Sequence, residues 1–126
     1  ESGRMAVASV LVPIDDEFDP TSALRRIDEM LKVIAPDARL TFLHVGSAAP
    51  QLRDENGAPL DLPIILRQGD VVGTIVSVAD ECGADLIAMP TAGRHGLFDA
   101  LRGSTTERVL REAGLPVLAA PIRIDR

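Results

Sequence analysis

Residues 84–120 read ADLIAMPTAGRHGLFDALRGSTTERVLREAGLPVLAA, and this stretch is the strongest indication of the fold. Two short apolar runs, at residues 84–89 and 115–120, lie on either side of a glycine-rich turn and a helical pattern at 104–113. A strand, a helix and a second strand in this order predict a parallel pair joined by a right-handed crossover.

Three further apolar runs upstream are predicted to be buried strands, at residues 7–12, 39–45 and 63–67. Helices are predicted to begin at Pro20, behind the potential N-cap Asp19, and after the potential N-cap Asp70. The side chains expected to face the core from the last two helices are Val72, Ile75, Val76, Ala79 and Cys82, then Val109, Leu110 and Ala113.

The element order β-α-β-loop-β-α-β-α-β predicts an α/β fold with a single open parallel sheet and flanking helices. Residues 46–63 contain several prolines and no sustained hydrophobic period, so we expect a long loop there and no helix. Residues 5–126 are expected to form one domain, with 1–4 as a tag remnant before Met5.

Composition narrows the possible partners. The chain of 126 residues has a net charge of −6 and only 2% aromatic residues, which argues against nucleic acid and anionic membrane surfaces as partners. Its one cysteine, Cys82, allows no intramolecular disulfide. Without a signal peptide or a long apolar run, a cytoplasmic protein is expected.

The strongest chemical motif is Gly93-Arg94-His95-Gly96, followed after six residues by Gly103-Ser104-Thr105 at the start of a predicted helix. Glycines allow a backbone to approach phosphate oxygens, and a helix N-terminus offers unpaired N–H groups to an anion. The alternative is a turn followed by an ordinary capping box, Ser104-x-x-Glu107, which needs no ligand.

Asp15 follows the first predicted strand directly after Pro13-Ile14. In doubly wound sheets, ligands bind beyond the carboxyl ends of strands where the strand order reverses. Asp15 and the glycine turn would then face one crevice, where a carboxylate accepts a hydrogen bond from a ribose hydroxyl or a base amino group. The alternative is that Asp15 is an acidic residue of an exposed turn.

Other chemistries are poorly supported by the spacing. His44, inside a predicted strand, is expected to be a core or crevice residue, and the set Asp15, His44, His95 and Asp99 matches no established metal motif. Ser104 with His95 and Asp99 lacks the Gly-x-Ser-x-Gly elbow of a hydrolase. A Mg²⁺ ion that accompanies nucleotide phosphates is the more plausible metal.

Taken together, these motifs resemble the universal stress protein family. The resemblance covers most of the chain outside 46–63 and is carried by VLVPIDDEFDP (10–20), LTFLHV (40–45), ADLIAMPTAGRHGL (84–97) and GSTTERVLREAGLPVLAAP (103–121). It implies a Rossmann-like sheet of five parallel strands in the order 3-2-1-4-5, and homodimers that often form through the last strand.

The resemblance also implies a nucleotide site. By position, phosphates of ATP would contact Gly93, Gly96, Gly103 and Ser104, adenine or ribose would contact Asp15, and the backbone of Val45 would lie near adenine. Pro13 and Thr105 would flank the ligand. The chain departs from the family pattern in its shorter spacing between Gly96 and Gly103 and in the missing helix between strands two and three.

Three functions follow as hypotheses. The first is a regulatory, homodimeric stress protein that binds ATP with Mg²⁺ and has at most weak ATP hydrolysis. The second is a dimeric stress-response interaction module that binds no nucleotide. The third is an enzyme acting on a small phosphorylated or acidic metabolite.

Overall fold

The computed structural model describes residues 7–14, 20–54, 56–92 and 104–122. In chain order its elements are β1 (Ser9–Pro13), α1 (Pro20–Ile34), β2 (Arg39–Val45), β3 (Ile64–Arg67), α2 (Val71–Glu81), β4 (Leu86–Ala92), α4 (Ser104–Ala113) and β5 (Val117–Ile122). The strands form one parallel sheet in the order β3-β2-β1-β4-β5, which confirms the predicted fold class. No helix lies between β2 and β3 in the described part of that connection, as the sequence predicted.

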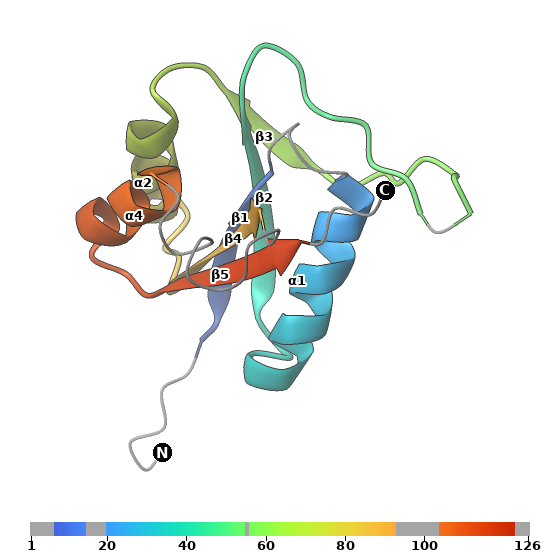
Figure 1. Ribbon diagram of the computed structural model, residues 1–126, viewed down its shortest axis with the longest axis horizontal. Coiled ribbons are helices and arrows are strands. Elements are labelled where there is room, and N and C mark those ends of the chain that lie inside the picture. The colour runs from blue at the N-terminus through green and yellow to red at the C-terminus, as the bar shows by residue number, and fades with distance from the viewer. Residues whose placement is uncertain (1–6, 15–19, 55, 93–103, 123–126) are drawn as a thin grey trace.

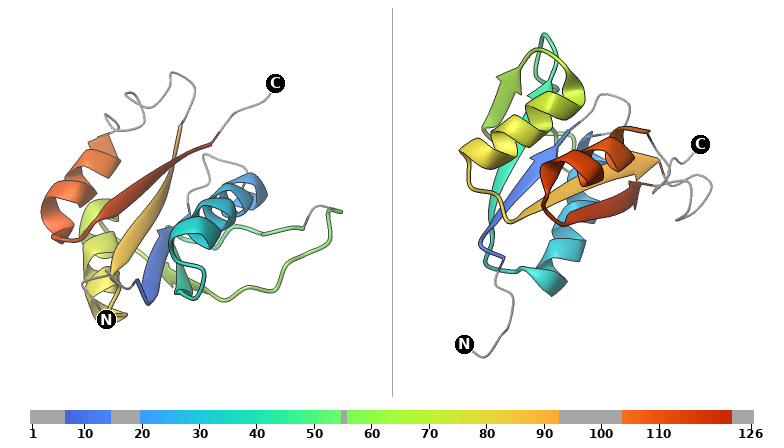
Figure 2. Two further views of the ribbon diagram at one scale, coloured as in Figure 1. Left: turned by 90° about the horizontal axis from the view of Figure 1, so that it is seen from below. Right: turned by 90° about the vertical axis from the view of Figure 1, so that its left-hand side faces the viewer.

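Helices cover the two faces of the sheet unequally (Figures 1 and 2). α2 and α4 lie together on one face, and α1 lies alone on the other. This division follows from right-handed crossovers, because the chain moves from β1 through β2 to β3 and then returns past β1 to β4 and β5. A helix between β2 and β3 would lie on the same face as α1, because the chain moves in the same direction across the sheet in both crossovers.

β1 is the central strand, and all five of its residues are buried. Its side chains alternate between two cores: Leu11 joins the one beneath α2 and α4, while Val10 and Val12 join the one beneath α1. Both faces of a parallel strand in such a position must be apolar, which explains the continuous run Val10-Leu11-Val12.

α1 is an amphipathic helix with buried Ala23, Ile27 and Leu31 at four-residue spacing. It begins at Pro20, whose fixed φ suits the first helical position, and it ends two residues before Pro36. Its apolar stripe packs over β4 and β5 as well as β1. α1 therefore leaves the face of β2 and β3 without a helix above it.

On that part of the sheet the apolar side chains are incompletely covered. Leu40 and Phe42 of β2 and Ile64 of β3 are half-buried, and Leu66 of β3 is 42% exposed. Phe42 lies opposite Ile64 in the β2–β3 register, so these side chains form one continuous surface.

α2 begins as predicted at the N-cap Asp70, whose side chain accepts a hydrogen bond of 2.7 Å from the Gly73 N–H. Gly83, just past the helix, has φ +65°, a left-handed conformation that favours glycine. The buried face includes Val78, which the sequence analysis did not assign, whereas Val76 and Cys82 are only partly buried.

α4 has the predicted bounds but buries a different face. Val109 is fully buried, whereas Leu110, expected in the core, is 53% exposed. Thr106, three residues before Val109, takes the second inward position of this helix. The periodicity alone could not choose between the two stripes, because α4 is short and both contain apolar residues.

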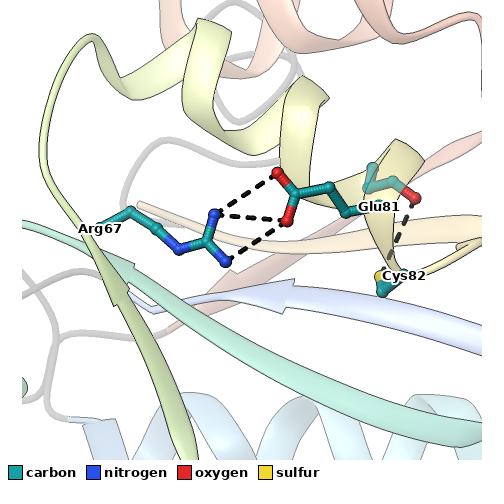
Figure 3. Close-up of polar contacts among 4 residues, drawn as sticks. Arg67, Glu81 and Cys82 are labelled. Carbon is teal, nitrogen blue, oxygen red and sulfur yellow. Dashed lines mark hydrogen bonds and ion pairs between the residues drawn. The ribbon is translucent and has the colours of Figure 1, made fainter.

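An exposed ion pair connects the edge strand β3 to α2 (Figure 3). The Arg67 guanidinium lies 3.3 and 3.4 Å from the two carboxylate oxygens of Glu81. Because both side chains are about half exposed, this pair contributes only about 0.2–1 kcal/mol to stability.

The Asp70 cap predicts a measurable effect on stability. Asp70→Ala removes the acceptor for the Gly73 N–H and should lower the free energy of unfolding by about 1 kcal/mol, or the melting temperature by about 4 °C. Asp70→Asn retains a capping oxygen and should lose less than half as much. Equal losses in the two variants, measured by urea and thermal unfolding, would contradict the capping role.

Candidate functional site

Pairing between β1 and β4 ends before the carboxyl edge of the sheet. β1 and β4 pair only at Val10–Leu86 and Leu11–Ile87. Beyond these residues β1 continues to pair with β2, and β4 continues to pair with β5 through Ala92. This divergence is the point at which the strand order reverses, the expected ligand crevice of a doubly wound sheet.

Two prolines explain why pairing stops there. The Ile14 N–H donates to a β2 carbonyl over 2.7 Å, so by alternation the backbone of Pro13 is turned toward β4. The Ile87 N–H donates to the residue before β5 over 3.1 Å, so the backbone of Pro90 is turned toward β1. Each strand therefore lacks a donor on the side of the gap, and the ladder cannot continue.

Pro90 also corrects the predicted end of the fourth strand. The apolar run at 84–89 predicts a strand that ends before Pro90, whereas β4 runs through Pro90 to Ala92. The proline does not interrupt the pairing of β4 with β5, because its missing donor is on the edge of β4 that faces β1.

The predicted site residues that the structure describes lie at this edge of the sheet or after β4. Pro13 is buried at the end of β1, and Val45 is half-buried at the end of the neighbouring β2. Ser104 is the first residue of α4, and Thr105 is exposed in its first turn. Asp15, Gly93, Gly96 and Gly103 lie outside the described residues, as do His95 and Asp99.

α4 brings its N-terminus to the same end of the molecule as the carboxyl end of β4 (Figure 2, left). The helix has ten residues, beginning at Ser104. Its first N–H groups and the positive end of its dipole therefore lie at the carboxyl-edge end of the sheet. This arrangement can attract an anion.

His44 and Gly46 are two residues at this edge that the sequence analysis did not assign to the site. His44 is 6% exposed, and its Nδ1 lies 2.8 Å from the Ile14 carbonyl oxygen. A Cβ on Gly46 would lie 2.6 Å from His44 Nε2, closer than side chains approach. The one sequence signal that could have indicated them is a glycine two residues after a histidine in a strand. That pattern is too common to assign a role to either residue.

The 46–63 connection forms a hairpin arm, defined here as residues 51–54 and 56–60. The Leu60 N–H donates to the Leu52 carbonyl and the Asp54 N–H to the Ala58 carbonyl, each over 2.8 Å. The Asp54 side chain accepts from backbone N–H groups of the turn, and Gly57 has φ +84°. The predicted loop is thus irregular but internally bonded.

The hairpin arm is attached to α1 at the beginning of that helix. The Thr21 hydroxyl donates to the Arg53 carbonyl over 2.6 Å and accepts from the Arg53 N–H over 3.2 Å. Leu52 is buried, while most of the arm projects beyond α1 (Figure 1). α1 follows β1, so this attachment places the arm beside the carboxyl edge of the sheet.

Within the described ranges, no cluster of three or more His, Cys, Asp or Glu side chains could hold a metal ion. The helices of that same part of the chain also include none that is long and apolar enough to cross a bilayer.

The fold and this edge define an open α/β domain of the kind that binds ligands at a topological switch point. Residues 48–121 match the model of the universal stress protein family, and the chain belongs to that family. The resemblance stated from the sequence is therefore confirmed.

Individual relatives agree with this assignment. A universal stress protein of Synechocystis is 26% identical over 94% of this chain and 88% of its own length. A universal stress protein solved in complex with cAMP superposes with a TM-score of 0.61 at 24% identity, covering 94% of this chain and 99% of the other. One from Archaeoglobus fulgidus in complex with dAMP has a TM-score of 0.56 at 18% identity, covering 91% and 98%.

Thr21 predicts how the hairpin arm is held. Thr21→Val keeps the shape of the side chain but loses both bonds to Arg53, so the Arg53 amide should exchange with solvent about tenfold faster. Ser47→Ala, which removes an exposed hydroxyl near the start of the same connection, should leave that rate unchanged. Hydrogen exchange followed by NMR measures this, and an unchanged rate in Thr21→Val would show that other contacts hold the arm.

Proposed function

We propose that this protein is a regulatory universal stress protein that binds an adenine nucleotide, ATP with Mg²⁺, at the carboxyl edge of its sheet. The observation that carries the proposal is the gap between β1 and β4, kept open by Pro13 and Pro90, at the end of the molecule to which α4 brings its N-terminus. The phosphates would lie at the N-terminus of α4 and the nucleoside at the ends of β1 and β2.

The phosphate end of the proposal rests on the Gly103-Ser104-Thr105 motif. Ser104 opens a helix, so N–H groups without intrahelical partners are available there, and a hydroxyl can add a further hydrogen bond. A glycine directly before the helix leaves room for a phosphate oxygen. We assign Gly93 and Gly96 to the same phosphate-binding segment, from the sequence pattern.

The nucleoside end of the proposal rests on Pro13, Asp15 and Val45. Pro13 lies at the gap between β1 and β4. Asp15 follows Ile14, the last described residue after β1. A carboxylate at this position would accept a hydrogen bond from ribose or from the adenine amino group. That two relatives of this fold were solved with cAMP and dAMP supports an adenine nucleotide as the ligand class.

The test is a thermal shift with millimolar MgATP, beside MgADP and pyrophosphate. A ligand at about 100 times its Kd stabilises by about 2.7 kcal/mol, which raises the melting temperature by about 8 °C or more for a domain of this size. Gly103→Val should lose the shift, because a valine occupies the space for a phosphate oxygen. Ser47→Val, at an exposed position, is the matched control and should retain the shift.

No shift with any of the three ligands would contradict nucleotide binding. It would favour the second candidate function, an interaction module without nucleotide. The specific observation behind that alternative is the incompletely covered apolar surface of β2 and β3, where Leu66 is 42% exposed.

We also propose a cytoplasmic homodimer that forms through β5. β5 is an edge strand that pairs only with β4, and an unpaired apolar edge is a site of association. The single cysteine fits a reducing compartment.

If the protein is a homodimer, analytical ultracentrifugation at micromolar concentration should give the sedimentation coefficient of a dimer, with or without nucleotide. β5 should then show slower amide exchange than β3, the other edge strand. A monomer throughout this range would contradict the dimer, and equal exchange in the two edge strands would place the interface elsewhere.

A further inference from the structure

We propose that His44 is the positioning residue for the nucleoside half of the site. Its ring fixes the backbone at Ile14, directly after β1, and at Val45, the last residue of β2. This inference rests on the proposed nucleotide binding and adds to it a residue that contacts no ligand itself. It is argued from two close approaches of the ring at the carboxyl edge of the sheet.

The first approach is to β1. A carbonyl oxygen can only accept, so the 2.8 Å contact between His44 Nδ1 and the Ile14 carbonyl means that Nδ1–H donates. His44 is buried, so water cannot replace this bond without cost. Ile14 immediately precedes Asp15, and its own N–H donates back to β2 at Leu43 over 2.7 Å. The two bonds therefore fix the backbone of Ile14 at the carboxyl end of β1.

The second approach is to Gly46. The ring occupies the place of a side chain on this residue, since a Cβ there would lie 2.6 Å from Nε2 and 3.2 Å from Cδ2. The Gly46 N–H donates to the Arg67 carbonyl of β3 over 2.8 Å. The backbone between His44 and Gly46 is Val45, which is thus held between the ring and the neighbouring strand.

One imidazole accordingly holds the backbone at the ends of two neighbouring strands, at Ile14 directly after β1 and at Val45 of β2. The proposed phosphate half includes the start of α4, which follows β4, the strand on the other side of the gap from β1 and β2. Loss of the ring should weaken recognition of the nucleoside and leave recognition of phosphate unchanged. A histidine that only fills the core would lower stability without this selectivity.

The experiment measures affinity by titration calorimetry for two probes, MgATP and Mg-tripolyphosphate, in three variants. His44→Leu keeps an apolar side chain of similar size but has no donor, and we expect about tenfold weaker MgATP binding with tripolyphosphate affinity within twofold of the parent. His44→Asn can place its amide N–H where Nδ1 was, and MgATP affinity should recover to within about threefold. Gly46→Ala displaces the ring and should reproduce the selective loss even if His44→Leu fails to fold.

The outcomes distinguish failure of the proposed nucleotide binding from failure of the role of His44. If the parent protein binds neither probe, the proposed function is wrong and this inference fails with it. If the parent binds MgATP and His44→Leu or Gly46→Ala binds it equally well, only the role of His44 is overturned. An equal loss of both probes, or no recovery in His44→Asn, would also overturn it, because a positioning role requires selectivity and rescue.

Discussion

The burial of β1 on both faces is the constraint on which the rest of this structure depends. All five residues from Ser9 to Pro13 are buried, and two separate cores meet on this strand. A central strand of this kind is stable only if helices cover it on both sides, which α1 does on one face and α2 with α4 on the other. Each fully buried aliphatic side chain contributes about 1.5–3 kcal/mol to the free energy of unfolding, so moving any part of this strand out of the core is costly.

The same strand determines where the proposed ligand site lies. β1 remains paired to β2 up to Pro13, but its pairing with β4 ends after Leu11. Pro13 and Pro90, which have no N–H to donate, face each other's strand across the resulting gap. The end of this pairing is thus determined by the backbone of the two strands. His44 then holds the β1 side of the gap in place through the Ile14 carbonyl. Stability at this edge and the geometry of the proposed site have a common origin.

The missing helix between β2 and β3 has consequences on the α1 face. In its place the chain has the hairpin arm, closed by its own turn at Asp54 and Gly57 and attached through Thr21 and Arg53. The arm buries Leu52 but leaves the side chains of Leu40, Phe42 and Leu66 only partly covered. The α1 face therefore has an incomplete helical layer, with an apolar surface over β2 and β3.

Local signals predicted most of the fold. The helix at Val71–Glu81 was predicted from its Asp70 cap, and β2 was predicted from Arg39 to Val45, because caps, prolines and apolar runs act over a few residues. They failed where a choice depended on neighbours: Val78 and Thr106 are buried, Leu110 is exposed, and β4 continues through Pro90. Each of these depends on which surface is packed or which edge is unpaired.

The candidate site divides in the same way. The sequence by itself indicated the family, the parallel sheet, the glycine motif and the residues following the strands, since these are patterns of adjacent residue types. Only the tertiary structure brought His44 to Ile14 and Gly46 to Arg67, and turned Pro13 and Pro90 toward one gap. The physical reason is that hydrogen-bond direction and steric room are properties of strands brought together in register, and no single segment contains them.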